Sequence, residues 1–455
     1  MTDKTAVPGK AGEASRLWTK YQCLLITVLV LVSICNTMDR GVLTLVQEHV
    51  KRELELSDLQ LGLLSGPVFA VFYSLAGLPV ARLSERWNRS RLLACCLAFW
   101  SAATVLCSTA SSFLQIALFR AGVGLGEGGA NPISHSLVAD TFTARQRGIA
   151  MSVLSAAIPL GMVIAPLTIG FVAHEWGWRV AFLVAGLPGL ILAPIVWFMV
   201  REPRHARAEP VVAGRFHTDL AWMFRNRAFS WVFAAAVFNG IGIMGVGLFT
   251  ASFLLREYQL NIAQVGTIIS IAGAMGLLGT FIGGYLADRF ADDRGRSYVL
   301  VPAVGAGLSF LAFGLAFRMD TIILGIAFIL VGNVMTDLKN GPNWAAVQNI
   351  VPSTMRTTAS AIFFIAATVL GGGLGGLLVG AFSDVAAANH FTLGDIDQFC
   401  VAGHGIAGAT AAVDTACREA VAAGLKTTLA VVPVTFLVAM GCFLLASRTI
   451  AINHD

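Results

Sequence analysis

The chain has 455 residues, of which 56% are hydrophobic and only 13% charged, and its formal net charge is +5. Soluble domains carry about 25% charged residues, so this composition excludes an ordinary soluble protein and predicts a helical membrane protein. The net charge is too small to indicate nucleic-acid binding. The first twenty residues are polar and the apolar stretch after them is long enough to remain as a span, so we expect no signal peptide.

Twelve apolar stretches are long enough to cross the roughly 30 Å hydrocarbon core of a bilayer as helices. A basic, proline-containing segment separates the first six from the last six. We therefore expect an all-α membrane protein with an N-terminal half at 1–200, a cytoplasmic linker at 201–228 and a C-terminal half at 229–455. The spans run at 21–43, 58–81, 92–110, 113–139, 146–172, 179–200, 229–255, 262–286, 298–317, 321–345, 356–383 and 424–447.

Spans 1 and 4 carry ionisable residues inside apolar sequence. In span 4, Arg120 and Glu127 are seven residues apart, which is two helical turns, so both project from nearly the same face. In span 1, Asp39 lies about 27 Å along the helix, and Arg120 lies about 10 Å below the outer surface, at 1.5 Å per residue. The two are at comparable depth, and we expect them to form an ion pair. Arg40 points about 100° away from Asp39 and faces a different neighbour.

These four residues are the predicted substrate-binding and proton-coupling site, because a lone charge in a membrane core costs roughly 3 kcal/mol or more. Burial favours the neutral form of a carboxyl group, whereas a nearby arginine favours the charged form. We expect Glu127 to respond to protons, and Arg40 and Arg120 to attract an anionic headgroup, since guanidinium groups suit phosphate or carboxylate. The alternative is a static ion-pair network that holds spans 1 and 4 together.

The two halves carry matching charges where their second spans end. The first half has Arg82, Glu85 and Arg86, and the second has Asp288 and Arg289. Such paired patterns are typical of transporters built from repeats. We interpret the five residues as a cytoplasmic gate whose ion pairs form in the outward-open state. The alternative is that they only set the topology.

Three further residues are possible secondary members of the site. His135 lies two turns beyond Glu127 and could relay protons or simply pack with a hydrogen bond. Asp337 and Lys339 of span 10 could bind substrate, contribute to a gate, or snorkel toward the cytoplasmic end.

The segment at 384–423 connects spans 11 and 12 on the outer side and contains Cys400 and Cys417. An extracytoplasmic loop lies in an oxidising compartment, so a disulfide is expected there, with two unpaired thiols as the alternative. The other six cysteines lie in predicted spans, and none has the spacing of metal ligands.

Lysines and arginines gather at the first twenty residues, the linker and the loops that follow the even-numbered spans 2, 4, 8 and 10. By the positive-inside rule, both termini face the cytoplasm.

Several motifs together resemble the major facilitator superfamily over essentially the whole chain. The segment Gly284-Tyr-Leu-Ala-Asp-Arg289 is similar to its loop motif, and Arg82-Leu-Ser-Glu-Arg86 is a degenerate copy with Ala81 in place of the usual glycine. Within the superfamily the chain resembles the spinster family. That resemblance is carried by Asn36-Thr-Met-Asp-Arg40, Leu56-Ser-Asp-Leu-Gln-Leu-Gly-Leu-Leu-Ser-Gly66, Trp87-Asn-Arg89, Arg120-Ala-Gly-Val-Gly-Leu-Gly-Glu-Gly-Gly129, Ala139-Asp-Thr-Phe142 and Arg147.

The resemblance implies a twelve-helix fold with two pseudo-symmetric halves that works by alternating access. It also implies a bacterial inner-membrane transporter of lysophospholipids or sphingoid phosphates that is coupled to protons. The rival is a proton-coupled organic-anion symporter for sugar acids or carboxylates. Members of that family usually have Trp before the Phe-Pro that ends span 4, where this chain has Asp140-Thr-Phe142.

Other classes of membrane protein lack support in the sequence. There is no His-Glu-x-x-His or Gly-x-Ser-x-Gly motif and no clustering of the eight histidines, so we expect neither an enzyme nor a metal site. A channel would need a repeated filter or a charged ring. The expected partners are an amphipathic small molecule, protons and the bilayer, with no cofactor and no nucleic acid, and we expect a monomer.

Overall fold

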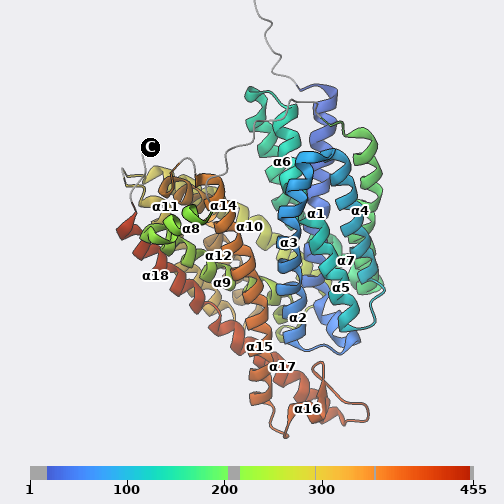
Figure 1. Ribbon diagram of the computed structural model, residues 1–455. Coiled ribbons are helices and arrows are strands. Elements are labelled where there is room, and N and C mark those ends of the chain that lie inside the picture. The colour runs from blue at the N-terminus through green and yellow to red at the C-terminus, as the bar shows by residue number, and fades with distance from the viewer. Residues whose placement is uncertain (1–17, 203–215, 293, 353–354, 451–455) are drawn as a thin grey trace, which may run out of the picture.

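The computed structural model describes residues 18–202, 216–292, 294–352 and 355–450. Within its helices a few side chains, including that of Glu85, lie outside the description. Two groups of long helices stand side by side (Figure 1). The described part of the N-terminal group consists of α1 (Lys20–Leu54), α2 (Asp58–Ser65), α3 (Pro67–Arg86), α4 (Arg89–Cys107), α5 (Phe113–Glu127), α6 (Ala130–Thr141) and α7 (Ala144–Met199).

The C-terminal group begins with a short helix and ends near the C-terminus of the chain. A hairpin of two-residue antiparallel strands lies between its last long helices. Its described elements are α8 (Phe216–Arg225), α9 (Arg227–Glu257), α10 (Ile262–Arg289), α11 (Ser297–Ala316), α12 (Ile322–Asp337), α13 (Asn340–Ile350), α14 (Arg356–Ile365), the π-helical turn η2 (Ala366–Gly372), α15 (Gly373–His390), α16 (Ile396–Phe399), β1 (Cys400–Val401), β2 (His404–Gly405), α17 (Ala411–Val431) and α18 (Val434–Thr449).

The predicted twelve-span membrane fold is confirmed. Among the described residues, ten helical stretches are long and apolar enough to cross a membrane. One of them contains two crossings, because Gly177 interrupts α7 with φ 83° and ψ 168°. The short helices α5 and α6 together make the remaining crossing, with Gly128 and Gly129 between them.

The connection between α15 and α17 is shorter than the predicted 384–423 loop. Helix α15 continues to His390 and α17 already begins at Ala411. Helix α17 can start before the apolar sequence does, because the Thr410 side chain caps its N-terminus. A small core that includes Phe391 and Cys417 packs the two helix ends together. Local capping and packing, rather than hydropathy, therefore set these boundaries.

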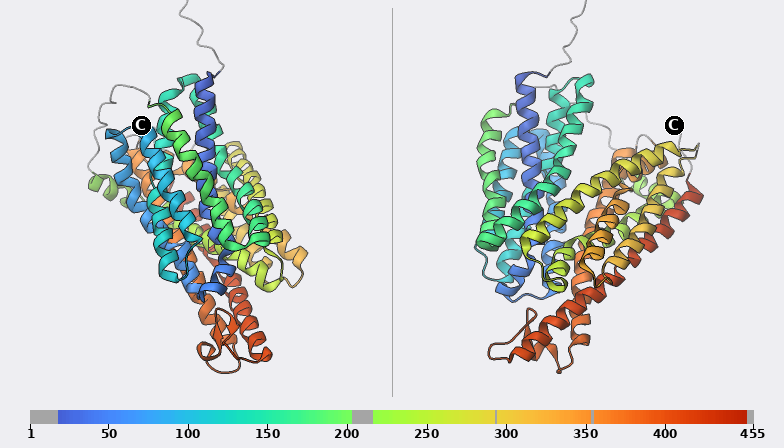
Figure 2. Two further views of the ribbon diagram at one scale, coloured as in Figure 1. Left: turned by 90° about the vertical axis from the view of Figure 1, so that its right-hand side faces the viewer. Right: turned by 180° about the vertical axis from the view of Figure 1, so that it is seen from behind.

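We call the end of the molecule where α7 ends and α9 begins the linker end, and the opposite end, with α2 and the β hairpin, the far end. The two groups of helices converge at the far end and diverge toward the linker end (Figures 1 and 2). The hydrophobic core has the same asymmetry. At the far end one cluster joins both groups, from Leu43 and Phe182 to Phe249 and Phe436. At the linker end each group has a separate cluster of its own.

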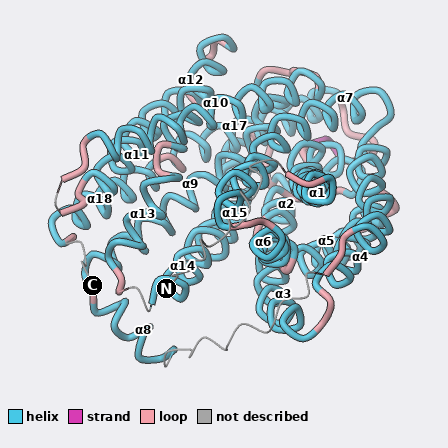
Figure 3. Tube along the Cα trace, turned by 90° about the horizontal axis from the view of Figure 1, so that it is seen from above, coloured by secondary structure: helices cyan, strands magenta, loops and turns pink. Residues whose placement is uncertain are grey.

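Glycines allow the close approach at the far end. A Cβ atom added to Gly62 of α2 would collide with the backbone of Gly376 of α15, and one on Gly266 of α10 would collide with the carbonyl of Pro166 in α7. Small residues let helix backbones approach closely in membranes, where lipid supplies no hydrophobic force between helices. Viewed from the linker end, α15 lies near the middle of the molecule, beside α3 (Figure 3).

Candidate functional site

Helices α1 and α5 place Arg40 against Glu127. The Arg40 Nε donates a hydrogen bond of 2.6 Å to Glu127 Oε2. The Glu127 side chain is fully buried, whereas the Arg40 side chain is 37% exposed. Arg40 is therefore the member of the pair that an incoming molecule can reach.

Two aromatic rings of α3 lie against the guanidinium of Arg40. The Arg40 Cζ atom lies 4.7 Å from the ring centre of Tyr73 and 5.2 Å from that of Phe69. Phe69 also lies 5.3 Å from the guanidinium carbon of Arg120. Helices α1 and α3 both contact the C-terminal group, so this cationic and aromatic surface lies near the boundary between the groups.

The contact between Arg120 and Asp39 differs from the ion pair that we expected. Arg120 Nη1 donates a 3.0 Å hydrogen bond to the backbone carbonyl of Asp39 rather than to its carboxylate. Among the described residues, no hydrogen bond reaches either carboxylate oxygen of Asp39, and the side chain is fully buried. Its polar neighbours are Trp100 and Thr104 of α4. The two residues are adjacent, as their depths require, but Asp39 is rotated toward α4.

The depth of Glu127 in the membrane did not predict which residue it pairs with. We expected Arg40 to face a different neighbour from Asp39, and the structure shows that this neighbour is Glu127. Among the described residues, no well-aligned hydrogen bond reaches the second carboxylate oxygen of Glu127, or Asn36 Nδ2 and Arg120 Nε near it. Helices that only pack together bury apolar side chains, so this cluster of polar atoms differs from ordinary helix packing.

The secondary candidates lie apart from this cluster. His135 is an exposed residue of α6. Asp337 and Lys339 are half-buried at the junction of α12 and α13, and their charged atoms are 3.9 Å apart. Asn340 joins them, because it donates a hydrogen bond to Asp337 and accepts one from Lys339; it also donates one to Thr280 of α10. This polar group belongs to the C-terminal group of helices, and among the described residues it forms no hydrogen bond or ion pair with Arg40 or Glu127.

A second cluster of buried charges, which the sequence did not lead us to single out, closes the far end. Arg256 of α9 binds both Glu48 of α1 and Asp58 of α2, with N–O distances of 2.6–2.9 Å. Lys51 Nζ donates a 2.6 Å hydrogen bond to Asp58, which also accepts one from Ser383 of α15. We call these five residues the far-end cluster. Because Lys51, Asp58 and Arg256 stand close to the ends of predicted spans, they resembled ordinary loop charges in the sequence.

Residues 29–376 match the family model of the Major Facilitator Superfamily. The chain belongs to this superfamily. It is 34% identical over 360 residues to an MFS-type efflux pump of Mycolicibacterium smegmatis, which covers 78% of this chain and 83% of that protein. It is 28% identical to the sphingosine-1-phosphate transporter SPNS2 of Danio rerio over 88% of this chain and 83% of that protein.

A solved structure has the same fold. The inward-facing, unoccupied crystal structure of a bacterial homolog to the human lysosomal transporter Spinster matches with a TM-score of 0.84. The identity is 26%, and the match covers 96% of this chain and 100% of that chain. The chain is thus a multi-pass major facilitator transporter related to the spinster proteins, as its motifs indicated.

The five residues that the sequence led us to expect as a gate are on helices that end at the linker end. Arg82, Arg86, Asp288 and Arg289 are exposed, and the side chain of Glu85 lies outside the description. Asp288 accepts a 3.0 Å hydrogen bond from Tyr298. None of the described ion pairs joins the two groups of helices at this end. Among the gate residues whose side chains the structure describes, no ion pair across the two groups is formed in this conformation, in which the linker end is spread apart.

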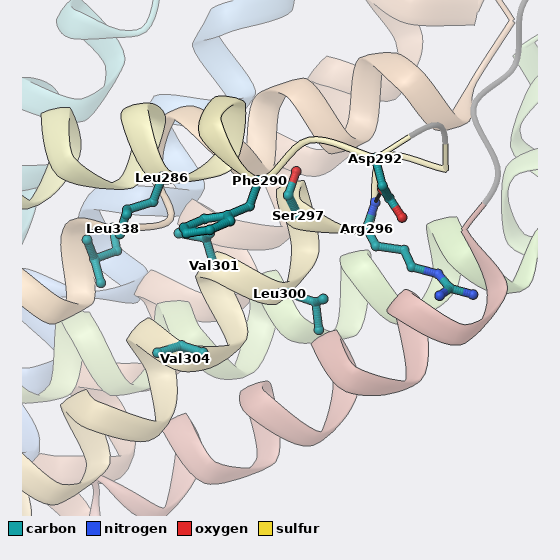
Figure 4. Close-up of a pocket in the computed structure, with 9 residues that line it drawn as sticks. All are labelled: Leu286, Phe290, Asp292, Arg296, Ser297, Leu300, Val301, Val304 and Leu338. Carbon is teal, nitrogen blue, oxygen red and sulfur yellow. Dashed lines mark hydrogen bonds between the residues drawn. The ribbon is translucent and has the colours of Figure 1, made fainter.

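The remaining candidate sites are a disulfide and a surface pocket. Cys400 and Cys417 form a disulfide with a Cα–Cα distance of 5.7 Å. A pocket of about 530 Å³ lies where α10 and α11 meet at the linker end, with Asp292 and Arg296 at one side of it and apolar side chains elsewhere (Figure 4). Among the described residues, no group of His, Cys, Asp or Glu is arranged to hold a metal ion.

Proposed function

We propose that the protein is a secondary active transporter of an anionic, lipid-like amphipath, of the lysophospholipid or sphingoid phosphate type, and that Glu127 couples transport to protons. The observation that carries the proposal is the ion pair between partly exposed Arg40 and fully buried Glu127. A fully buried carboxylate needs the arginine to balance its charge. A partly exposed arginine, in contrast, can bind an anion from outside in place of that carboxylate.

The pair gives a physical route to coupling. When Glu127 takes up a proton, its attraction for Arg40 falls and the guanidinium becomes free to bind a phosphate or carboxylate. Charge-assisted hydrogen bonds of this kind contribute about 1.5–3 kcal/mol each. Proton uptake and anion binding then strengthen each other, and by linkage each ligand raises the affinity for the other by the same factor.

Arg120 and Asp39 have supporting roles in this scheme. The hydrogen bond from Arg120 to the Asp39 carbonyl holds α5 against α1 at the residue before Arg40. The unpartnered carboxylate of Asp39 is a second group that can take up a proton as the cluster rearranges. The four residues then act as one unit within the N-terminal half.

The substrate class draws on the relatives and on the site. One relative is named a sphingosine-1-phosphate transporter, and such a molecule combines a phosphate with an apolar chain. Another is named an efflux pump. Tyr73 and Phe69 beside Arg40 provide apolar surface next to the positive charge. An anion with an apolar portion fits both features better than a polar sugar acid does.

We further propose that the protein works as a monomer in a bacterial inner membrane, with the linker end in the cytoplasm. The excess of arginine and lysine at that end supports this orientation. In alternating access, the conformation described here is the one that is open to the cytoplasm.

Transport by purified protein in proteoliposomes tests the proposal. Uptake of a labelled lysophospholipid by the wild type should respond to an imposed proton gradient, and an excess of sugar acid should not compete. Glu127→Gln should abolish the response to the gradient, because the amide does not titrate. Glu53→Gln is the matched control, since Glu53 is a half-exposed glutamate that pairs with Arg179 at the far end.

The outcomes separate the two parts of the proposal. Intact pH-dependent transport by Glu127→Gln contradicts the proton role. Competition by sugar acids, without competition by other lysolipids, contradicts the lipid-like substrate and favours an organic-anion symporter.

A further inference from the structure

A second positively charged pocket lies outside the transport site, on the outer surface of the C-terminal group at the linker end. It measures about 500 Å³ and lies between the end of α8, the start of α9 and the end of α18. We call it the Arg227 pocket, and it is lined by Phe224, Arg227, Ser230, Trp231, Leu445, Arg448 and Thr449.

The pocket is positively charged. Arg227 and Arg448 come from different helices and converge on it, and both are exposed. No carboxylate is among its lining residues. No described residue forms an ion pair with either guanidinium. Two convergent guanidinium groups match the geometry of a phosphate.

The pocket in Figure 4 provides an internal comparison. There, Asp292 and Arg296 line the same end of the cavity, and Asp292 accepts a 2.7 Å hydrogen bond from the Arg296 backbone N–H. A carboxylate of the protein is thus already present where an anion would bind. The two pockets are similar in size, so it is charge that distinguishes the Arg227 pocket.

Apolar residues extend from each arginine toward the middle of the membrane. On α9, Trp231 and Phe238 follow Arg227 by four and eleven residues, which keeps them near one face of the helix, and each is 36% exposed. On α18, four exposed residues precede Arg448 and lie on the same face of the helix as it does: Leu445, Leu444, Val438 and Leu437. Helices α9 and α18 pack against each other. A polar head held by the arginines would therefore continue into two adjoining apolar surfaces.

Helix α8 places the pocket at the surface of the membrane. It is a short amphipathic helix, and Phe224 near its end packs on α9, with ring-centre distances of 5.1 Å to Phe233 and 6.0 Å to Phe229. Amphipathic helices of this kind lie in the plane of the interface, with the apolar face toward the acyl chains. The Arg227 pocket is therefore at headgroup depth, on the side that carries the excess of positive charge.

We propose that the Arg227 pocket binds the phosphate of an anionic membrane phospholipid, with its acyl chains along α9 and α18. Basic pockets between helices on the cytoplasmic side recognise such headgroups. The site is distinct from the Arg40–Glu127 pair, which lies in the other half of the protein. Its occupant is a membrane component that stabilises the contact between α8, α9 and α18, and it is not the transported molecule.

The test measures the unfolding temperature of detergent-purified protein during titration with phosphatidylglycerol, phosphatidylcholine or inorganic phosphate. Phosphatidylglycerol should raise the unfolding temperature of the wild type, and the other two should not. Arg227→Gln or Arg448→Gln should each weaken the apparent affinity for phosphatidylglycerol about fivefold, and the double variant more. Arg294→Gln, at an exposed arginine of the same end, is the matched control.

Two further variants keep the result interpretable. Arg120→Gln alters the proposed transport site, and its response to phosphatidylglycerol should match that of the wild type. A double variant with lysine at both positions keeps the charge and should recover part of the affinity, which separates lost binding from poor folding. Equal protection by phosphatidylcholine or by inorganic phosphate overturns the proposal. An undiminished response in the double glutamine variant also overturns it.

Discussion

The far end and the linker end of this transporter both carry charged side chains but use them differently. At the far end, Arg256 reaches across from one group of helices to Glu48 and Asp58 of the other, and the side chains are largely buried. At the linker end, the described ion pairs remain within one group, as in the pair between Arg89 and Asp140. A closed end is therefore one where charges pair across the boundary and lose contact with water. The same contacts must break before the far end can open.

The proposed coupling site in the N-terminal half is separate from both ends. Arg40 is partly exposed while Glu127 is fully buried, which is the arrangement that an exchange of partners requires. The far-end cluster has few exposed members, and its role is to bias one conformation. The variants below test this division, beginning with the largest expected effect.

The largest effect is expected from Arg256→Gln. It leaves Glu48 and Asp58 buried without their principal cation, and removing one member of a buried ionic network costs about 3–5 kcal/mol. The unfolding temperature should fall. A cysteine introduced by Gln47→Cys should also react faster with a soluble maleimide, because residue 47 is buried at the far end in the closed form.

Arg179→Gln is the matched control for that experiment. Arg179 pairs with Glu53 at the same end, but both side chains are partly exposed. Exposed pairs of this kind contribute about 0–1 kcal/mol. If Arg256→Gln unfolds at the same temperature as Arg179→Gln and the introduced cysteine stays protected, the far-end cluster does not hold the halves together.

A smaller effect is expected from Gly62→Ala. The added methyl group would collide with the backbone of Gly376, so α2 and α15 must separate. Overpacking of this kind costs about 1–3 kcal/mol. The same Gln47→Cys labelling should rise, by less than in Arg256→Gln. Gly247→Ala on α9 meets no atom within 4 Å and should leave the labelling unchanged, and equal labelling in the two alanine variants would contradict close packing as the cause.

The smallest effect on stability is expected at the linker end. Asp288 is exposed and its described partner is Tyr298, so Asp288→Asn should change the free energy of unfolding by no more than about 0.5 kcal/mol. If the gate pairs form in the outward-open state, the same variant should slow transport. Arg294→Gln in the adjacent loop should slow it less. Equal transport rates in the two variants would favour a purely topological role for the Asp288 charge.

The sequence indicated much of the N-terminal cluster because an ionisable residue in an apolar span is conspicuous. Asp39, Arg40, Arg120 and Glu127 all stand out in this way, and helical rise correctly put Asp39 and Arg120 beside each other. The helical rise per residue did not predict the direction in which each side chain points. The rotation of Asp39 toward α4 and the pairing of Arg40 with Glu127 depend on how α1, α4 and α5 pack.

The far-end cluster shows the opposite case. Each of its charges is unremarkable at the end of a span, and its importance arises only when α1, α2, α9 and α15 meet. Asp58 receives hydrogen bonds from Lys51, seven residues away, but also from Arg256 and Ser383, which are 198 and 325 residues away. No local pattern reports contacts over such distances in the chain.

The sequence by itself determined the class of protein, the twelve crossings and the family, because hydropathy, span length and short motifs are local properties. Tertiary structure alone decided which charges pair, which end is closed and where cationic pockets form. The physical reason is that a charge in a membrane protein acquires its role from burial and from its partners. Both are set by helices that pack together after the spans have formed.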